Sequence, residues 1–256
     1  MKPHHLQTKT LEFTYTGPHI DKGPLPSFFY FALSAHDSLF LSPYNHPVKF
    51  LEKYTQDLDI RIFSTTIPGH EEGRAKENAI EWWASQFKMG IDPLDGFIEA
   101  LCSSIEELYE KEILIKGKIV AGGLSRGALV AGLLSAKQNL VSSMIGFAPL
   151  TTLEYAKEFS SLQAEPIINQ YTLKRFAPQL SERKIRFYIG NHDTRVKTES
   201  AFELIKEIAS YAHSHRIKGS HEIFITNSIG YMGHGTSDET FKDGSLWVFE
   251  ELFYHG

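Results

Sequence analysis

The chain has 256 residues, of which 42% are hydrophobic and 22% are charged, and its formal net charge is −5. This size is sufficient to bury one large hydrophobic core. The acidic balance excludes the strongly basic character of nucleic-acid-binding domains, so we expect no nucleic-acid partner. A single cysteine, Cys102, excludes an intramolecular disulfide and fits a reducing compartment.

The chain shows no signal for a membrane or for export. No apolar run approaches the roughly 20 residues that a membrane-spanning helix needs. The first residues, Met1 to Phe13, lack the apolar stretch of a signal peptide. We therefore expect a cytoplasmic protein with no membrane span. Neither a repeat nor a linker divides the sequence, so residues 1–256 are expected to form one domain.

Apolar runs alternate with amphipathic stretches along the chain, as in a parallel sheet covered by helices on both faces. The expected elements, in chain order, are strands 10–16, 27–33 and 60–66, helices 73–87 and 93–109, strand 116–122, helix 127–136, strands 142–147 and 184–190, helix 199–212, strand 222–226 and helix 245–253. The less regular stretch at about 150–180 is expected to form short helices, as a small lid-like insertion. The predicted fold class is α/β: a mostly parallel, doubly wound sheet of about seven strands.

A candidate nucleophile lies between the strand at 116–122 and the helix at 127–136. The run from Gly123 to Gly127 reads G-L-S-R-G, which matches G-x-S-x-G with Ser125 at its centre. The motif needs this strand–turn–helix setting, because small flanking residues let a serine occupy a very tight turn. The alternatives are a plain glycine-rich turn between strand and helix, or a phosphate-binding loop. Against the loop, no lysine follows and the glycines do not have dinucleotide-binding spacing.

A serine hydroxyl needs a base to become a good nucleophile, and in this type of fold the acid and then the histidine follow the serine. Asp193 follows the strand at 184–190, and His234 lies between two glycines beyond the last strand. Both positions are at carboxyl ends of strands, where open α/β sheets place their sites. Among other histidines, His221 precedes its strand and His192 adjoins the acid, so neither is the preferred base.

Two backbone N–H groups are expected to form the oxyanion hole. One should come from Arg126, the residue after the nucleophile, and the other from the loop after the strand at 27–33. There, His36 is the expected donor and Ala35 is the near alternative.

These features resemble the α/β-hydrolase superfamily across nearly the whole chain, most closely its dienelactone-hydrolase and prolyl-oligopeptidase-like branches. The likeness rests on the turn around Ser125, the strand order, the P-G-H-E run at 68–71 and the I-G-N-H-D-T-R-V run at 189–196. The chain departs from the pattern where Ser34-Ala35 replaces the usual His-Gly. It also has serine where dienelactone hydrolases have a cysteine nucleophile, and we expect no propeller domain.

The expected function is hydrolysis of a small-molecule ester or related acyl substrate through an acyl-enzyme, without a metal or other cofactor. Phe159 and Ile168 are expected to line the acyl pocket. A small aminopeptidase or amidase is the alternative enzyme, with Glu154, Glu158 or Glu165 as the group that would hold a substrate amine. A non-catalytic ligand-binding protein with the same fold is the alternative outside enzymes. The sequence leaves the oligomeric state open.

Overall fold

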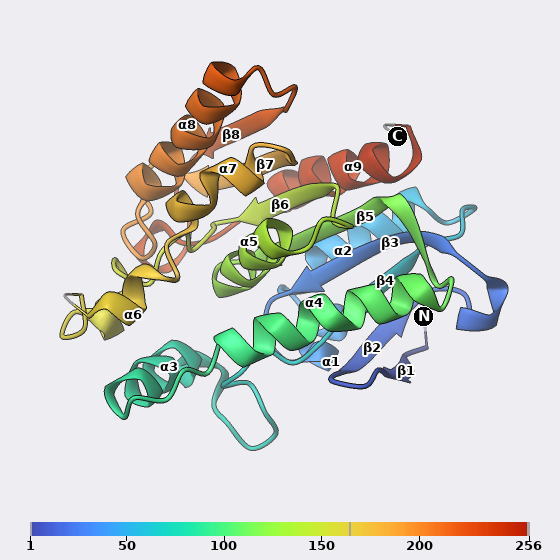
Figure 1. Cartoon of the computed structure of the whole chain (residues 1–256), viewed down its shortest axis with the longest axis horizontal. Coiled ribbons are helices and arrows are strands. Elements are labelled where there is room, and N and C mark those ends of the chain that lie inside the picture. Colours follow the sequence, from blue (N-terminus) through green and yellow to red (C-terminus); the bar gives the residue numbers. More distant parts are fainter. Residues whose placement is uncertain (1, 164, 255–256) are drawn as a thin grey trace.

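One mixed sheet organises the chain in the computed structural model, which describes residues 2–163 and 165–254. Its strand order is β1-β2-β4-β3-β5-β6-β7-β8 (Figure 1). The strands are β1 (His4–Gln7), β2 (Glu12–Thr16), β3 (Leu25–Phe31), β4 (Arg61–Ser64), β5 (Leu114–Leu124), β6 (Ser143–Phe147), β7 (Lys184–Gly190) and β8 (His221–Thr226). Pairs β1–β2 and β2–β4 are antiparallel, and the other pairs are parallel. The prediction of a mostly parallel sheet is confirmed, with β1 as one strand beyond the expected seven.

Helices connect the parallel strands. They are α1 (Ala35–Phe40), α2 (His46–Tyr54), α3 (Ala79–Lys88), α4 (Asp95–Glu110), α5 (Arg126–Lys137), α6 (Pro166–Asn169), α7 (Ala177–Leu180), α8 (Thr198–His215) and α9 (Asp238–Phe253). Short 3₁₀ helices add single turns at Ile20–Lys22, Lys76–Asn78, Lys157–Phe159, Leu173–Phe176 and Tyr231–Gly233. No helix of the described residues has both the length and the hydropathy to cross a bilayer.

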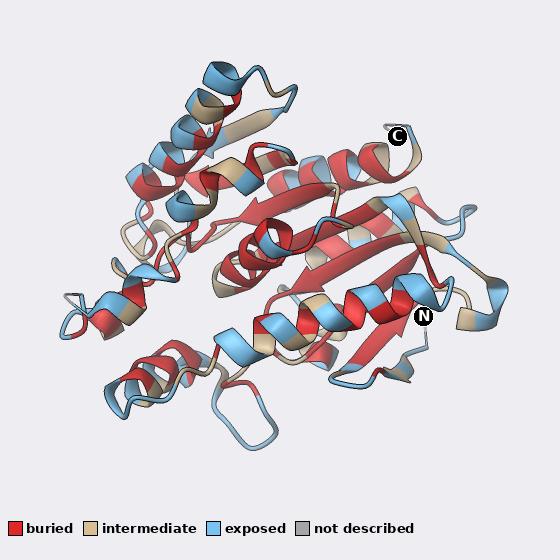
Figure 2. Ribbon diagram, in the orientation of Figure 1, coloured by how far each residue is buried: buried red, intermediate tan, exposed pale blue. Residues whose placement is uncertain are grey.

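The two faces of the sheet are buried under different helices. Along β3, Phe29 and Phe31 join a core with α4, α5 and α8, whereas Phe28 and Tyr30 join a second core with α2 and α9. This alternation follows from the two-residue period of a strand. Figure 2 shows the result: the central strands are buried, and the helices turn their exposed sides outward. The expected helices on both faces of the sheet are therefore present.

Candidate active site

The turn after β5 holds Ser125 in an unusual backbone conformation. Ser125 has φ +55° and ψ −116° and directly precedes α5. Its N–H donates to Phe147 O at 2.8 Å, and its carbonyl accepts from Leu150 N–H at 3.1 Å, which fixes the turn to the end of β6. Strain of this kind persists only where the surroundings enforce it, and it is concentrated at functional sites.

The glycines of the motif are required by space. A Cβ on Gly127 would lie 1.9 Å from Phe31 O, and a Cβ on Gly123 would lie 2.1 Å from the carbonyl carbon of Gly127. Neither position can accept a side chain without moving backbone. The close approach of β3, β5 and α5 at the serine therefore requires the two glycines of the G-x-S-x-G pattern.

His234 reaches Ser125 from the loop between β8 and α9. Its Nε2 lies 2.8 Å from Ser125 Oγ, and its Nδ1 lies 2.7 Å from Asp193 Oδ2. The loop packs closely against the turn after β7: a Cβ on Gly233 would lie only 2.2 Å from His192 O. Gly233 has φ +75°, which glycine adopts readily.

Asp193 is buried at the end of β7 and is held in one orientation. Its Oδ1 accepts from the N–H of Arg195 at 2.9 Å and of Val196 at 3.1 Å, which leaves Oδ2 facing the imidazole. An ionised carboxylate only accepts hydrogen bonds, so Nδ1 of His234 carries a proton. In the neutral ring, Nε2 is then the acceptor for the Ser125 hydroxyl.

The rival histidines lie elsewhere. His221 begins β8, at the opposite end of that strand from the His234 loop, and its Nε2 is 3.1 Å from Ser181 O. His192 is exposed beside Asp193.

The two expected N–H donors lie at the starts of α5 and α1. Arg126 is the first residue of α5, where backbone N–H groups have no intrahelical acceptor. Among the loop candidates, the Ala35 N–H already donates to Thr66 Oγ1 at 3.1 Å. The His36 N–H, in the first turn of α1, has no acceptor among the described residues. His36 is therefore the freer of the two expected donors, and its role stays a prediction.

Charged side chains that the sequence reasoning did not single out lie around the serine and the acid. Arg195 donates to both carboxylate oxygens of Glu158, at 2.7 and 3.1 Å, and so joins the loop after β7 to the 150–180 stretch. The Arg126 side chain donates to Lys76 O at 3.3 Å. Burial, and next the charge of Arg195, lower the pKa of Arg126 to about 10. In the sequence, the available signal was that Arg126 directly follows Ser125 and that Arg195 lies two residues after Asp193.

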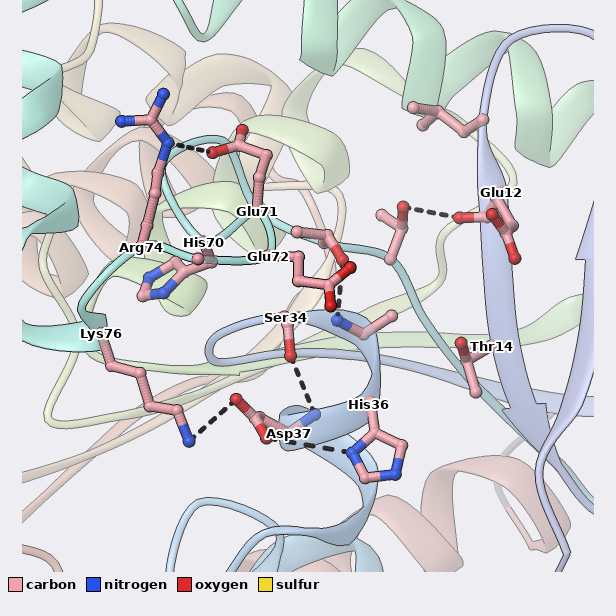
Figure 3. Close-up of a pocket in the computed structure, with 15 residues that line it drawn as sticks. Glu12, Thr14, Ser34, His36, Asp37, His70, Glu71, Glu72, Arg74 and Lys76 are labelled. Atoms are coloured by element: carbon pink, nitrogen blue, oxygen red, sulfur yellow. Dashed lines mark hydrogen bonds and ion pairs between the residues drawn. The ribbon is translucent and has the colours of Figure 1, made fainter.

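A cavity of about 740 Å³ opens beside the loop after β3. It is lined by the start of α1, by β2 and by the loop from His70 to Lys76 (Figure 3). Lys76 pairs with Asp37 at 3.0 Å, and Arg74 pairs with Glu71 at 3.0 Å. Ser125, Asp193 and His234 do not line this cavity, and the hydrogen bond from Arg126 to Lys76 O connects its wall to the residue after Ser125.

His70 lies in the wall of this cavity without a hydrogen-bond partner for its Nε2 in the described part of the chain. The residue is only 5% exposed. Burial, and next the Arg126 charge, lower the pKa of its imidazole to about 3. His70 is therefore neutral at physiological pH.

The 150–180 stretch, described at 150–163 and 165–180, connects β6 to β7. Figure 1 shows α6 beyond the arrowheads of β3 and β6, and the Lys157–Phe159 turn of this stretch contacts α3. Phe159 and Ile168 are fully buried, and Phe159 packs on Phe87 with ring centroids 5.8 Å apart. They belong to the core on the α4–α5 face and do not line the cavity of Figure 3. Their expected contribution to an acyl pocket stays a prediction.

Comparison with known proteins gives a structural likeness only. No family model matches the chain, and no curated protein matches it. The structure is similar to TT1662 from Thermus thermophilus, with a TM-score of 0.70 and 13% identity over 99% of both chains. It is also similar to the acylaminoacyl peptidase of Pyrococcus horikoshii, with a TM-score of 0.63 and 14% identity over 97% of this chain and 41% of that one.

Two further structures are similar to this chain, and the matched region covers different shares of their lengths. For 2,6-dihydroxy-pseudo-oxynicotine hydrolase, the TM-score is 0.63 and the identity 13%, over 98% of this chain and 68% of that one. For dipeptidyl peptidase 4 of Porphyromonas gingivalis, the TM-score is 0.64 and the identity 14%, over 97% and 35%. The chain thus spans less than half the length of the two named peptidases. The strand order and these similarities together show that the chain has the α/β-hydrolase fold.

Proposed function

We propose that this chain is a serine hydrolase that cleaves an ester or related acyl substrate through an acyl-enzyme. The observation that carries the proposal is the continuous hydrogen-bond chain from Ser125 through His234 to Asp193, with the serine on a strained turn. A glycine-rich turn without catalytic work would not require an imidazole and a buried carboxylate in this order. The names of the structural neighbours, which include peptidases and a hydrolase, agree with this reaction class.

Each side chain has a defined task in this proposal. Ser125 Oγ attacks the acyl carbon while His234 Nε2 takes the hydroxyl proton, and Asp193 stabilises the imidazolium that forms. The proton then passes to the leaving group, which departs and leaves the acyl group on Ser125. A water molecule then attacks the acyl carbon of the acyl-enzyme while His234 Nε2 takes a proton from the water. His234 returns this proton to Ser125 Oγ as the bond between Oγ and the acyl carbon breaks, which releases the acid. The N–H groups of Arg126 and His36 would stabilise the oxyanion, a contribution of about 10²–10³ in rate per donor in well-studied cases.

An aminopeptidase is the alternative, and it needs a carboxylate to hold a substrate amine. Of the three candidate glutamates, Glu158 is engaged by Arg195 through two hydrogen bonds. Within the described residues, Glu154 and Glu165 make no ion pair and no hydrogen bond to Ser125 or His234. The contacts around the serine therefore favour an acyl ester over a peptide with a free amine.

The test combines labelling with a substrate panel. A fluorophosphonate should label the wild-type chain at Ser125, and Ser125→Ala should remove both labelling and turnover of p-nitrophenyl esters. Aminoacyl p-nitroanilides in the same panel distinguish a peptidase from an esterase. Labelling that survives in Ser125→Ala would refute the nucleophile, and a folded wild type that neither labels nor hydrolyses would favour a non-catalytic binding protein.

A further inference from the structure

The charges beside Ser125 do not cancel. Arg195 and Glu158 form a two-bond pair in which both side chains are largely buried, 19% and 14% exposed, so they neutralise each other. Arg126 forms no ion pair within residues 2–163 and 165–254, and its side chain makes one hydrogen bond, to Lys76 O. A guanidinium has five N–H donors. One partly buried cation with unused donors is therefore left next to the nucleophile.

The positive charge of Arg126 is partly buried and is not balanced by an ion pair in the described residues. Burial and the Arg195 charge lower its pKa to about 10, so the side chain stays protonated at neutral pH. Tyr44, Glu158 and Glu77 act in the opposite direction on the pKa of Arg126, but each has a smaller effect than the repulsion from Arg195. A buried charge is costly unless it is paired and hydrogen-bonded. An incoming carboxylate would supply both the charge and the acceptors.

The two cationic side chains in the wall of the neighbouring cavity already form ion pairs. Lys76 pairs with Asp37 and Arg74 pairs with Glu71, as the dashed lines in Figure 3 show. Arg126 is anchored to this wall through Lys76 O, and it directly follows Ser125 in the chain. A substrate group bound by Arg126 would therefore lie close to the reacting carbonyl, on the side of the Ser34–His36 loop.

We propose that Arg126 binds a carboxylate of the substrate, so that the enzyme prefers acyl compounds carrying a negative charge near the bond that is cleaved. The inference rests on the proposed function and specifies its substrate class. The planar guanidinium fork matches a carboxylate with two parallel hydrogen bonds. A substrate ammonium, by contrast, would meet a net positive charge at the same place.

The experiment compares matched esters that differ in one charge. The mono-p-nitrophenyl ester of adipic acid is compared with p-nitrophenyl adipamate, in which an amide replaces the distal carboxylate. A second pair, 4-carboxyphenyl and 4-carbamoylphenyl acetate, places the charge on the leaving group. We expect kcat/KM of the wild type to favour the charged member of at least one pair by about tenfold or more, the usual scale of a hydrogen bond to a charged group.

Variants assign that preference to Arg126. The charged-to-neutral ratio should fall to about one in Arg126→Met and stay partly above one in Arg126→Lys. Glu158→Gln should raise the ratio, because it frees Arg195 as a second cation, and this test does not depend on the folding of the Arg126 variants. Arg175→Met, at an exposed arginine of the Leu173–Phe176 turn, is the control that should leave the ratio unchanged.

The outcomes separate the two proposals. Equal kcat/KM within both pairs in an active wild type, or a ratio that persists in Arg126→Met, would overturn the carboxylate inference alone. Loss of the ratio in Arg126→Met together with its rise in Glu158→Gln supports it. If the wild type neither labels with fluorophosphonate nor hydrolyses any ester, the proposed function fails and the inference fails with it.

Discussion

Replacing His70 with phenylalanine should reduce the loss of stability that the protein suffers in acid. The imidazole is buried in the wall of the cavity beside α1, and its Nε2 has no partner among the described residues. Burial lowers its pKa from an ordinary value of about 6.5 to about 3. Phenylalanine keeps a ring of similar shape and removes the titration.

The sign and size of this pH effect on the free energy of unfolding depend on whether the folded or the unfolded chain binds the proton. Between pH 6.5 and 3, the unfolded chain protonates this histidine and the folded chain does not, so the unfolded state gains stability as the pH falls. The contribution of neutral, buried His70 to the free energy of unfolding is therefore fully present above pH 6.5 and is lost progressively down to pH 3. Within this range, the free energy of unfolding falls by at most about 1.4 kcal/mol per pH unit through this group. Between pH 7 and pH 5, the wild type should thus lose at most about 2 kcal/mol through His70, a sizeable part of a typical 5–15 kcal/mol.

Urea unfolding at pH 7 and pH 5 measures this difference directly. The free energy of unfolding should fall less between the two pH values in His70→Phe than in the wild type, whatever the variant's stability at pH 7. His213→Gln is the matched control, because that ring is exposed on α8 and loses little hydration on folding. An identical pH dependence in the wild type and His70→Phe would refute the reasoning.

Three further changes test other parts of the structure. Gly127→Ala should destabilise the fold by several kcal/mol in urea unfolding, since its Cβ would lie 1.9 Å from Phe31 O, whereas Gly96→Ala on α4 meets nothing within 4 Å and should stabilise by about 0.4–1 kcal/mol. Arg61→Met should cost at least about 3 kcal/mol in the same assay, because this fully buried guanidinium donates to five backbone carbonyls. Asp193→Asn should keep the thermal midpoint and cut ester turnover by up to about 10⁴, because its amide favours the wrong tautomer of the histidine; turnover near wild type would identify another acid.

The regular elements with strong patterns could be predicted from the sequence. The strand Lys184–Gly190 has the expected bounds, and α4 and α5 lie within two residues of theirs. These segments have clear apolar patterning and define the core, so local sequence and tertiary packing agree. The helices α1 and α2 were not expected, because they are short and lie in a stretch that contains three serines and two prolines.

The positions of Ser125, Asp193 and His234 could be predicted because each follows a strand that the pattern reveals. Parallel strands bring their carboxyl ends to one edge, so order along the chain becomes proximity in space. The pairing of Arg195 with Glu158 could not be predicted in this way, since Glu158 lies in a stretch without periodicity. Which glutamate meets which arginine depends on how that stretch packs against α3 and the loop after β7.

The distribution of the three side chains along the chain also bears on the order of folding. Ser125 and His234 are 109 positions apart, and the loop of His234 is placed only when β8 pairs with β7 at the edge of the sheet. Contacts between distant segments require the closure of long loops and form slowly. During refolding from urea, helical ellipticity should therefore recover before reactivity toward fluorophosphonate, because Ser125 lacks its hydrogen bond to His234 in a chain whose β8 is still undocked.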